Sequence, residues 1–128
     1  MNVSTESRRL LCIAGVSLFL ATTAGAVGSH VLAVDERTLH SFETAVEFQF
    51  FHSLGLIGAV LTAERLGANL ALRAAAWLLV AGTLLFCASI YAATFGAPRG
   101  VLALAPYGGV ALMVGWLLFA AGVWIRRK

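Results

Sequence analysis

The charged residues of this 128-residue chain are gathered into short segments, and long uncharged runs lie between them. The uncharged runs hold 25, 16, 25 and 26 residues and cover Leu10–Val34, Phe48–Ala63, Ala74–Pro98 and Gly100–Ile125. About 20 mainly apolar residues span a bilayer as a helix, so three runs are long enough by themselves. The second run reaches that length when Thr44–Glu47 is included. The pattern predicts four membrane-spanning helices, at about residues 9–31, 40–64, 73–95 and 106–125.

The overall composition agrees with this pattern. Hydrophobic residues make up 60% of the chain, charged residues 12%, and the mean hydropathy is +0.90. A soluble domain usually has about 25% charged residues, and a disordered chain combines low hydrophobicity with high charge. The composition therefore argues against both classes. We predict one all-α domain over residues 1–128, an antiparallel bundle of four transmembrane helices.

The basic residues are distributed unevenly between the two predicted sides of the membrane. Two of the nine, Arg37 and Arg99, fall on one side. The other seven fall on the opposite side: Arg8, Arg9, Arg65, Arg73, Arg126, Arg127 and Lys128. The positive-inside rule places both termini and the middle loop in the cytoplasm. The basic residues do not form a stripe that could follow a phosphate backbone, so nucleic acid is not a predicted partner.

The amino-terminal run could also be interpreted as a cleaved export signal, because Arg8 and Arg9 precede it. The run continues to Val34, however, which is long enough to span a bilayer. We therefore expect a retained first helix. Two cysteines, Cys12 and Cys87, fall at different depths of their predicted helices, so we predict two small buried thiols and no disulfide.

Small residues recur at seven-residue intervals in the third and fourth predicted helices. They form two seams: Ala75, Gly82 and Ser89; and Gly108, Gly115 and Gly122. Such spacing keeps one stripe of a helix facing a neighbour. The neighbour could be the other of these two helices, packed antiparallel, or a second copy of the chain. In the first helix, Gly25 and Gly28 lie among further small residues, which allow close approach of another helix. Six glycines are therefore predicted to pack helices together: these two in the first helix and the four in the two seams.

Ionisable and polar side chains inside a membrane are expensive to hold and are candidates for function. The candidates are His30, Glu47, Gln49, His52 and Tyr91. His30 falls near the end of the first predicted helix, and the next three fall on the second. Gln49 and His52 are three residues apart, so they share a helix face. We predict a polar cluster between the first two helices, with Tyr91 at a similar depth on the third.

Several roles for this cluster remain open at this stage. Metal or haem ligation by His30 and His52 has weak support, because their depths differ by about two turns and no HxxxH pair exists. A second role is a proton or ion path through Glu47, Gln49 and His52. A third role is the binding of a lipid-soluble ligand, such as a quinone, by His52 or Tyr91. The plainest role is hydrogen bonding across the bundle to hold its geometry.

No catalytic constellation is visible in the sequence. Nothing resembles a Ser/His/Asp triad, a phosphate-binding loop or a paired-carboxylate site, so we predict no enzyme activity, no catalytic residue, no metal site and no cofactor. The leading hypothesis is a structural or accessory membrane protein that packs with itself or with a partner in the bilayer. The alternative is a protein that binds or transports a lipid, quinone or ion at the polar cluster. Transport would need a homo-oligomer, because no duplicated halves are visible.

Three segments in a fixed order also point to a known family. They are GAVGSH at Gly25–His30, TAVEFQFFHSL at Thr44–Leu54, and PYGG at Pro106–Gly109 with Gly115-Trp116 after it. Together they resemble the YgdD/YwdK-like small membrane proteins, domain of unknown function family 423. The LFCASIY stretch at Leu85–Tyr91 is similar to the third helix of that family. The resemblance covers about residues 10–124.

The resemblance implies a four-helix inner-membrane protein with no established activity. It places the recurrent polar positions of the family at His30, Gln49 and His52. The chain departs from the family pattern at Glu47, where an uncharged or basic polar residue is expected, and at Ala105, where a threonine cap is common. The second departure removes a helix cap, so we expect a less fixed start for the fourth helix.

Overall fold

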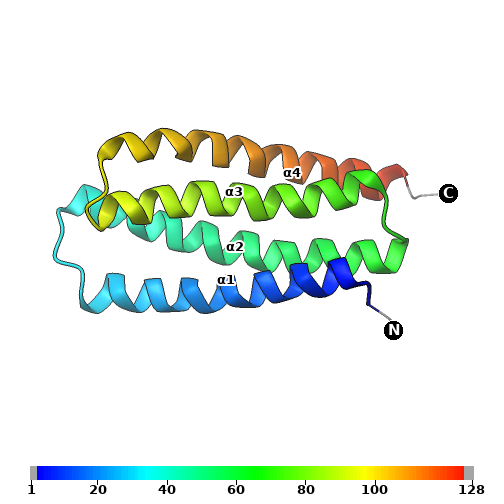
Figure 1. The fold of residues 1–128 in the computed structure, drawn as a ribbon, viewed down its shortest axis with the longest axis horizontal. Helices are drawn as coiled ribbons and strands as arrows, with labels where there is room; N and C mark the ends of the chain where they lie inside the picture. Colours follow the sequence, from blue (N-terminus) through cyan, green and yellow to red (C-terminus); the bar gives the residue numbers. More distant parts are fainter. Residues whose placement is uncertain (1–2, 126–128) are drawn as a thin grey trace.

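The computed structural model describes residues 3–125, which form four antiparallel α-helices (Figure 1). The helices are α1 (Thr5–His30), α2 (Glu36–Leu66), α3 (Leu70–Thr94) and α4 (Ala105–Ile125), with a short 3-10 helix η1 (Arg99–Leu104) before α4. Four helical segments, the last being η1 with α4, are long and apolar enough to cross a membrane. The predicted all-α, four-helix membrane architecture is confirmed. Three of the basic residues that are predicted to face the cytoplasm lie outside the described residues: Arg126, Arg127 and Lys128.

The first three helices begin three or four residues earlier than predicted because polar side chains cap them. The caps are Ser4, Asp35 and Asn69. The side-chain oxygen of each accepts a hydrogen bond from the backbone N–H three residues ahead, at 3.1, 3.0 and 2.9 Å. Such bonds satisfy N–H groups that the first helical turn leaves unpaired. The hydroxyl and N–H of Thr38 also hold the pKa of the Asp35 carboxyl below its usual value.

The start of α4 is organised differently. No side-chain cap is present there, and η1 runs directly into the helix. The N–H of Ala105 donates to the carbonyl of Leu102, which is a 3-10 type bond, and Pro106 has no N–H to satisfy. The segment between the third and fourth predicted helices, residues 96–105, is therefore mostly helical, and a 3-10 turn leads into α4 without a side-chain cap.

The helices α3 and α4 pack backbone against backbone. A Cβ atom added to Gly82, Gly108 or Gly122 would lie within 2.8 Å of a heavy atom on the facing helix. One added to Gly115 would lie 3.4 Å from the carbonyl oxygen of Ala75. The two seven-residue seams thus face each other within one chain. Of the two partners that their spacing allowed, the third and fourth helices are partners of each other.

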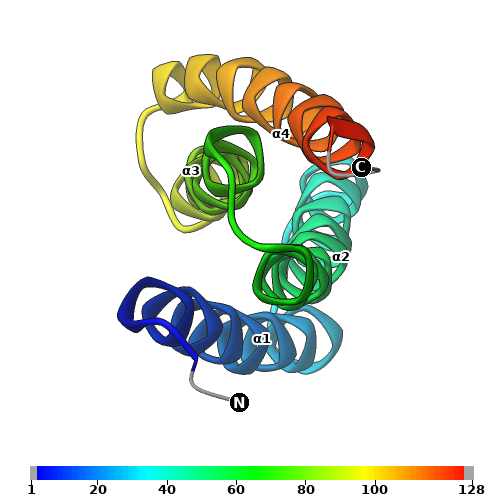
Figure 2. The same ribbon diagram turned by 90° about the vertical axis from the view of Figure 1, so that its right-hand side faces the viewer.

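The helix α2 lies beside both α1 and α3, whereas α4 lies on the side of α3 that is turned away from α1 (Figure 2). Trp116 of α4 also reaches α2, where its ring lies against Gly55. On α1, the predicted packing glycines Gly25 and Gly28 face α2, with Val46 and Phe42 nearest to their added Cβ atoms. In its most apolar stretch, α1 has 17% of its residues buried, against 39% for α2. The first helix is therefore the most peripheral of the four.

Candidate functional site

A long groove lies between α1 and α3, and α2 forms its floor. Its volume is about 780 Å³, within the range of typical ligand pockets. Its walls run from Cys12 to Val27 on α1, and from Leu79 on α3 to Phe95, the residue that follows this helix. At 1.5 Å per residue each wall is about 22–24 Å long, so the groove covers most of the roughly 30 Å hydrocarbon core of a bilayer.

The two walls of the groove are almost entirely apolar. They include the exposed side chains of Val16, Leu20 and Leu84, whose relative exposures are 59%, 51% and 66%. Exposed apolar side chains on both walls suit a groove that opens sideways into lipid. Cys12 is also exposed and lies at one end of the groove, so the prediction that it is buried is wrong, whereas Cys87 is buried. The face of α1 at Cys12 has no neighbouring helix to cover it.

A hydrogen-bond network on the floor of the groove joins three helices. The Gln49 amide nitrogen on α2 donates to the carbonyl oxygen of Ser17 on α1 at 3.0 Å and to its hydroxyl oxygen at 3.3 Å. The Tyr91 hydroxyl on α3 donates to the Gln49 amide oxygen at 2.7 Å, and the Ser53 hydroxyl donates to the Ser17 hydroxyl at 2.7 Å. Gln49 is buried, and both ends of its amide are paired. This network fixes α1 and α3 at a set separation across α2.

His52 lines the same groove one turn further along α2. Its Nδ1 lies 2.7 Å from the carbonyl oxygen of Phe48, so an N–H at Nδ1 donates a hydrogen bond to that oxygen. In the neutral ring, Nε2 is then an acceptor. The ring also lies beside the rings of Phe48 and Trp116, at centroid distances of 5.3 and 6.1 Å. Its orientation is therefore set by protein contacts, and its acceptor nitrogen remains available to a ligand.

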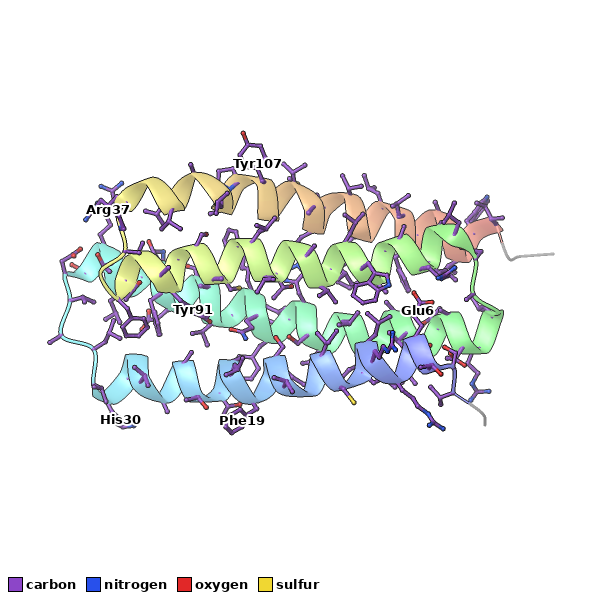
Figure 3. All side chains as sticks on the ribbon, viewed as in Figure 1. Glu6, Phe19, His30, Arg37, Tyr91 and Tyr107 are labelled. Carbon is purple, nitrogen blue, oxygen red and sulfur yellow. The ribbon has the colours of Figure 1, made fainter. Side chains whose placement is uncertain are left out.

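Two of the predicted polar residues lie outside the groove. His30 is exposed at the end of α1 and projects away from the other helices (Figure 3). Glu47 is also exposed and, with Glu43, lines a smaller pocket of about 390 Å³ between α1 and α2. Gln49, His52 and Tyr91 therefore share one site, and His30 and Glu47 do not. Among residues 3–125, no three His, Cys, Asp or Glu side chains gather as a metal site requires.

Four hydroxyl residues that line this site were not among the candidates from the sequence: Ser17, Thr23, Ser53 and Thr83. Ser53 follows Gln49 by four residues, so their shared helix face was a usable signal. Ser17 left no such signal, because its contact depends on the register between two helices. Thr83 lines the groove and makes no hydrogen bond within the described chain.

Four other threonines in these helices bond the carbonyl oxygen four residues earlier in their own helix. They are Thr22, Thr23, Thr44 and Thr94. Thr83 lacks such a bond, so its hydroxyl is a free donor on an otherwise apolar wall. Together with the His52 acceptor, it gives the groove a small number of polar groups on mainly hydrocarbon walls, which suits a ligand that is mostly hydrocarbon.

The two ends of the groove differ in chemistry. At one end, the ring of Phe42 lies 5.2 Å from that of Tyr91 and 6.1 Å from that of Phe95, measured between centroids. We call this the Phe95 end. Beyond the other end, one Glu6 carboxylate oxygen on α1 accepts from the Arg73 Nε at 2.9 Å, and the second accepts from the Trp77 Nε1 at 2.8 Å (Figure 3). We call this the Glu6 end, and here side chains tie α1 directly to α3.

Comparisons with known proteins agree with the motifs in the sequence. A family model described as "Protein of unknown function (DUF423)" matches residues 24–109. The inner membrane protein YgdD of Escherichia coli K12 is 31% identical, over 95% of this chain and 95% of its own. A UPF0382 membrane protein of Haemophilus influenzae is 30% identical, over 89% and 92%. YwdK of Bacillus subtilis, also named a membrane protein, is 29% identical over 84% and 89%. No solved structure matches the chain.

Proposed function

The chain belongs to the DUF423 family of membrane proteins, and we propose that it is a non-enzymatic protein that binds a lipid-like molecule in the groove between α1 and α3. Membership confirms the resemblance carried by the three sequence motifs. The observation that carries the proposal is the apolar groove of about 780 Å³, which reaches across most of the bilayer core and has a satisfied polar network at its floor.

The packing of α3 against α4 favours ligand binding over an accessory role. The accessory hypothesis depended on the small-residue seams, which could have served a second copy or a partner. Gly108, Gly115 and Gly122 instead lie against α3 of the same chain. The groove is an apolar surface that no helix of the described chain fills. An empty apolar gap forfeits dispersion contacts, so hydrocarbon is the favoured filling inside a membrane.

The length and polarity of the groove favour a chain molecule. Its two walls are almost entirely apolar and about 22–24 Å long, which suits an extended acyl or isoprenoid chain. Polar side chains line it at only a few positions, as in a site for a ligand that is mostly hydrocarbon.

The side chains around the groove support a role in binding without chemistry. The Cys87 thiol donates to the carbonyl oxygen of Ala45 at 3.2 Å, and the His52 Nδ1 is engaged by its own helix. A nucleophile next to a general base is the arrangement that covalent catalysis requires. In the described chain, these two groups are each bonded to a backbone carbonyl and not to each other.

The charge pattern supports an orientation with the Glu6 end in the cytoplasm. Arg8, Arg9, Arg65 and Arg73 lie at this end of the helices, because α1 and α3 begin here and α2 ends here. Arg37 and Arg99 lie at the opposite end. We propose that both termini and the α2–α3 loop face the cytoplasm, as the positive-inside rule predicts.

The proposal is tested by filling the groove with a side chain. Ala88 lines the groove from α3 and is exposed, so Ala88→Trp places an indole where the ligand would lie. Ala120 is also exposed but lies on α4, which contributes no residue to the groove, so Ala120→Trp is a matched control. Each protein is released gently from its own membranes and weighed by native mass spectrometry.

We expect the wild type and Ala120→Trp to retain an added mass of lipid size, and Ala88→Trp to lose it. An unchanged added mass in Ala88→Trp would show that the ligand lies elsewhere. A wild-type protein that carries no added mass, but forms a fixed stoichiometry with itself or another chain, would overturn ligand binding in favour of the accessory role.

A further inference from the structure

Arg9 continues the α1 wall of the groove beyond its Glu6 end. It precedes Ile13 by four residues and Val16 by seven, and both of these line the groove. Residues at these spacings share a helix face. Arg9 is exposed, and its Cα lies about 5 Å along the helix from that of Cys12, where the wall begins.

Arg73 continues the opposite wall in the same way. It precedes Val80 by seven residues and Leu84 by eleven, so it lies on the groove face of α3. Its side chain is 56% exposed. Only its Nε is engaged by Glu6, and a guanidinium group has five N–H donors, so the donors of its terminal nitrogens remain free. Both walls therefore end in an arginine with donors to spare.

The charges at the two ends of the bundle complement only one orientation of a negatively charged lipid. The carboxylate of Glu6 is oriented by Arg73 and Trp77, and with Arg9 included these side chains carry a net positive charge. At the Phe95 end of the bundle, acidic residues outnumber Arg37 and Arg99; they are Asp35, Glu36, Glu43 and Glu47. A negatively charged headgroup is attracted to the first end and repelled from the second.

From this we propose that the ligand is an anionic phospholipid, whose phosphate lies between Arg9 and Arg73 at the Glu6 end while one acyl chain runs along the groove toward the Phe95 end. The inference rests on the proposed function and names its ligand class. Arginine presents its donors in a planar fork that matches phosphate oxygens. The groove is about 22 Å long, longer than half of the bilayer core, so its walls can border an acyl chain from this leaflet over the whole length of the chain.

The test compares two lipids that differ only in headgroup charge. The protein is stripped of lipid in detergent and offered equal amounts of phosphatidylglycerol and phosphatidylcholine with the same acyl chains, and bound masses are counted by native mass spectrometry. We expect the wild type to prefer phosphatidylglycerol, and Arg9→Gln to reduce that preference about fivefold, the effect of removing one basic residue near an anionic surface. Arg73→Lys keeps the charge and loses the fork, so we expect a smaller reduction.

Arg8→Gln is the matched control. Arg8 is exposed and carries the same charge, but it lies about 100° around the helix from Arg9, so it lies beside the Cys12 edge of the groove face and Arg9 at its middle. We expect its lipid preference to equal that of the wild type. An equal loss in Arg8→Gln and Arg9→Gln would show diffuse attraction to the surface and overturn the site between Arg9 and Arg73.

The outcomes also separate this inference from the proposed function. Equal binding of both lipids, abolished by Ala88→Trp, would overturn the headgroup assignment and leave lipid binding in the groove intact. Absence of binding by either lipid, in wild-type protein that remains folded, would overturn both.

Discussion

The two sides of α3 are packed in opposite ways. On the side that faces α4, the added Cβ atoms of Gly82 and Gly108 would collide with the facing helix. On the side that faces α1, a groove of about 780 Å³ separates the two helices. One helix therefore packs backbone against backbone on one side and borders an open groove on the other.

This contrast shows what brings helices together when lipid surrounds them. Lipid tails are as apolar as leucine, so apolar burial alone gives little reason for two helices to meet. Small residues let α3 and α4 gain close backbone contact. The α1-facing side of α3 carries larger residues such as Val80, Leu84 and Tyr91, and there the helices are joined by hydrogen bonds instead. The fit of α4 depends on shape, and the position of α1 depends on directional bonds.

The largest expected effect comes from adding one methyl group to the α3–α4 contact. In Gly108→Ala, the new Cβ would lie 2.5 Å from the Phe86 backbone nitrogen, so the helices must separate. We expect a loss of about 2–3 kcal/mol in the free energy of unfolding, since overpacking costs of this size are typical. Gly109→Ala is the control, because nothing lies within 4 Å of its Cβ. Equal stability of the two variants in a denaturant titration would contradict the close packing.

The next effect comes from the polar network that positions α1. Gln49→Ala removes the hydrogen bonds to both Ser17 and Tyr91 and leaves their groups unpaired. We expect a loss of about 1–2 kcal/mol, the upper range for hydrogen bonds between membrane helices. Thr22→Val, which removes an exposed hydroxyl bonded within its own helix, serves as the control. If both variants unfold at the same denaturant concentration, the network does not hold α1 in place.

A smaller effect is expected from the single bond between α3 and Gln49. Tyr91→Phe removes the hydroxyl that donates at 2.7 Å, for an expected loss of about 0.6 kcal/mol. Tyr107→Phe should change nothing, because Tyr107 is exposed and points away from the bundle (Figure 3). A double-mutant cycle with Gln49→Ala should show non-additive losses, since the two residues share one bond. Additive losses would mean that the bond contributes nothing to stability.

Much of the fold could be predicted because each of its determinants is local to one helix. Uncharged runs of sufficient length specify four spans, since backbone groups in lipid must be paired within a helix. The helix starts were placed too late because the capping residues, such as Ser4 and Asp35, lie outside the apolar runs. The seven-residue spacing identified which faces of α3 and α4 pack against another helix. Which helix each face contacts became known only from the arrangement of the whole chain.

The site could be predicted only in part for the same reason. Gln49, His52 and Tyr91 stood out as polar residues within spans, and all three line the groove. The positions of His30 and Glu47 along their helices indicated their depths in the membrane. The sequence did not show which neighbouring helix each side chain faces, and neither residue lines the groove. The groove itself left no mark on the sequence, because it is a separation between two helices.

The smallest expected effect concerns the tie between α1 and α3 at the Glu6 end. Glu6→Gln keeps an oxygen that can accept from Trp77 but removes the ion pair with Arg73, whose side chain is 56% exposed. Partly exposed pairs contribute little, so we expect the free energy of unfolding to change by less than about 0.5 kcal/mol. The spacing of the two walls should change more visibly. Spin labels at Cys12 and at Val80→Cys, with Cys87 replaced by alanine, report this spacing across the groove. We expect their distance distribution to broaden in Glu6→Gln, and an unchanged distribution would show that contact with α2 alone positions the first helix.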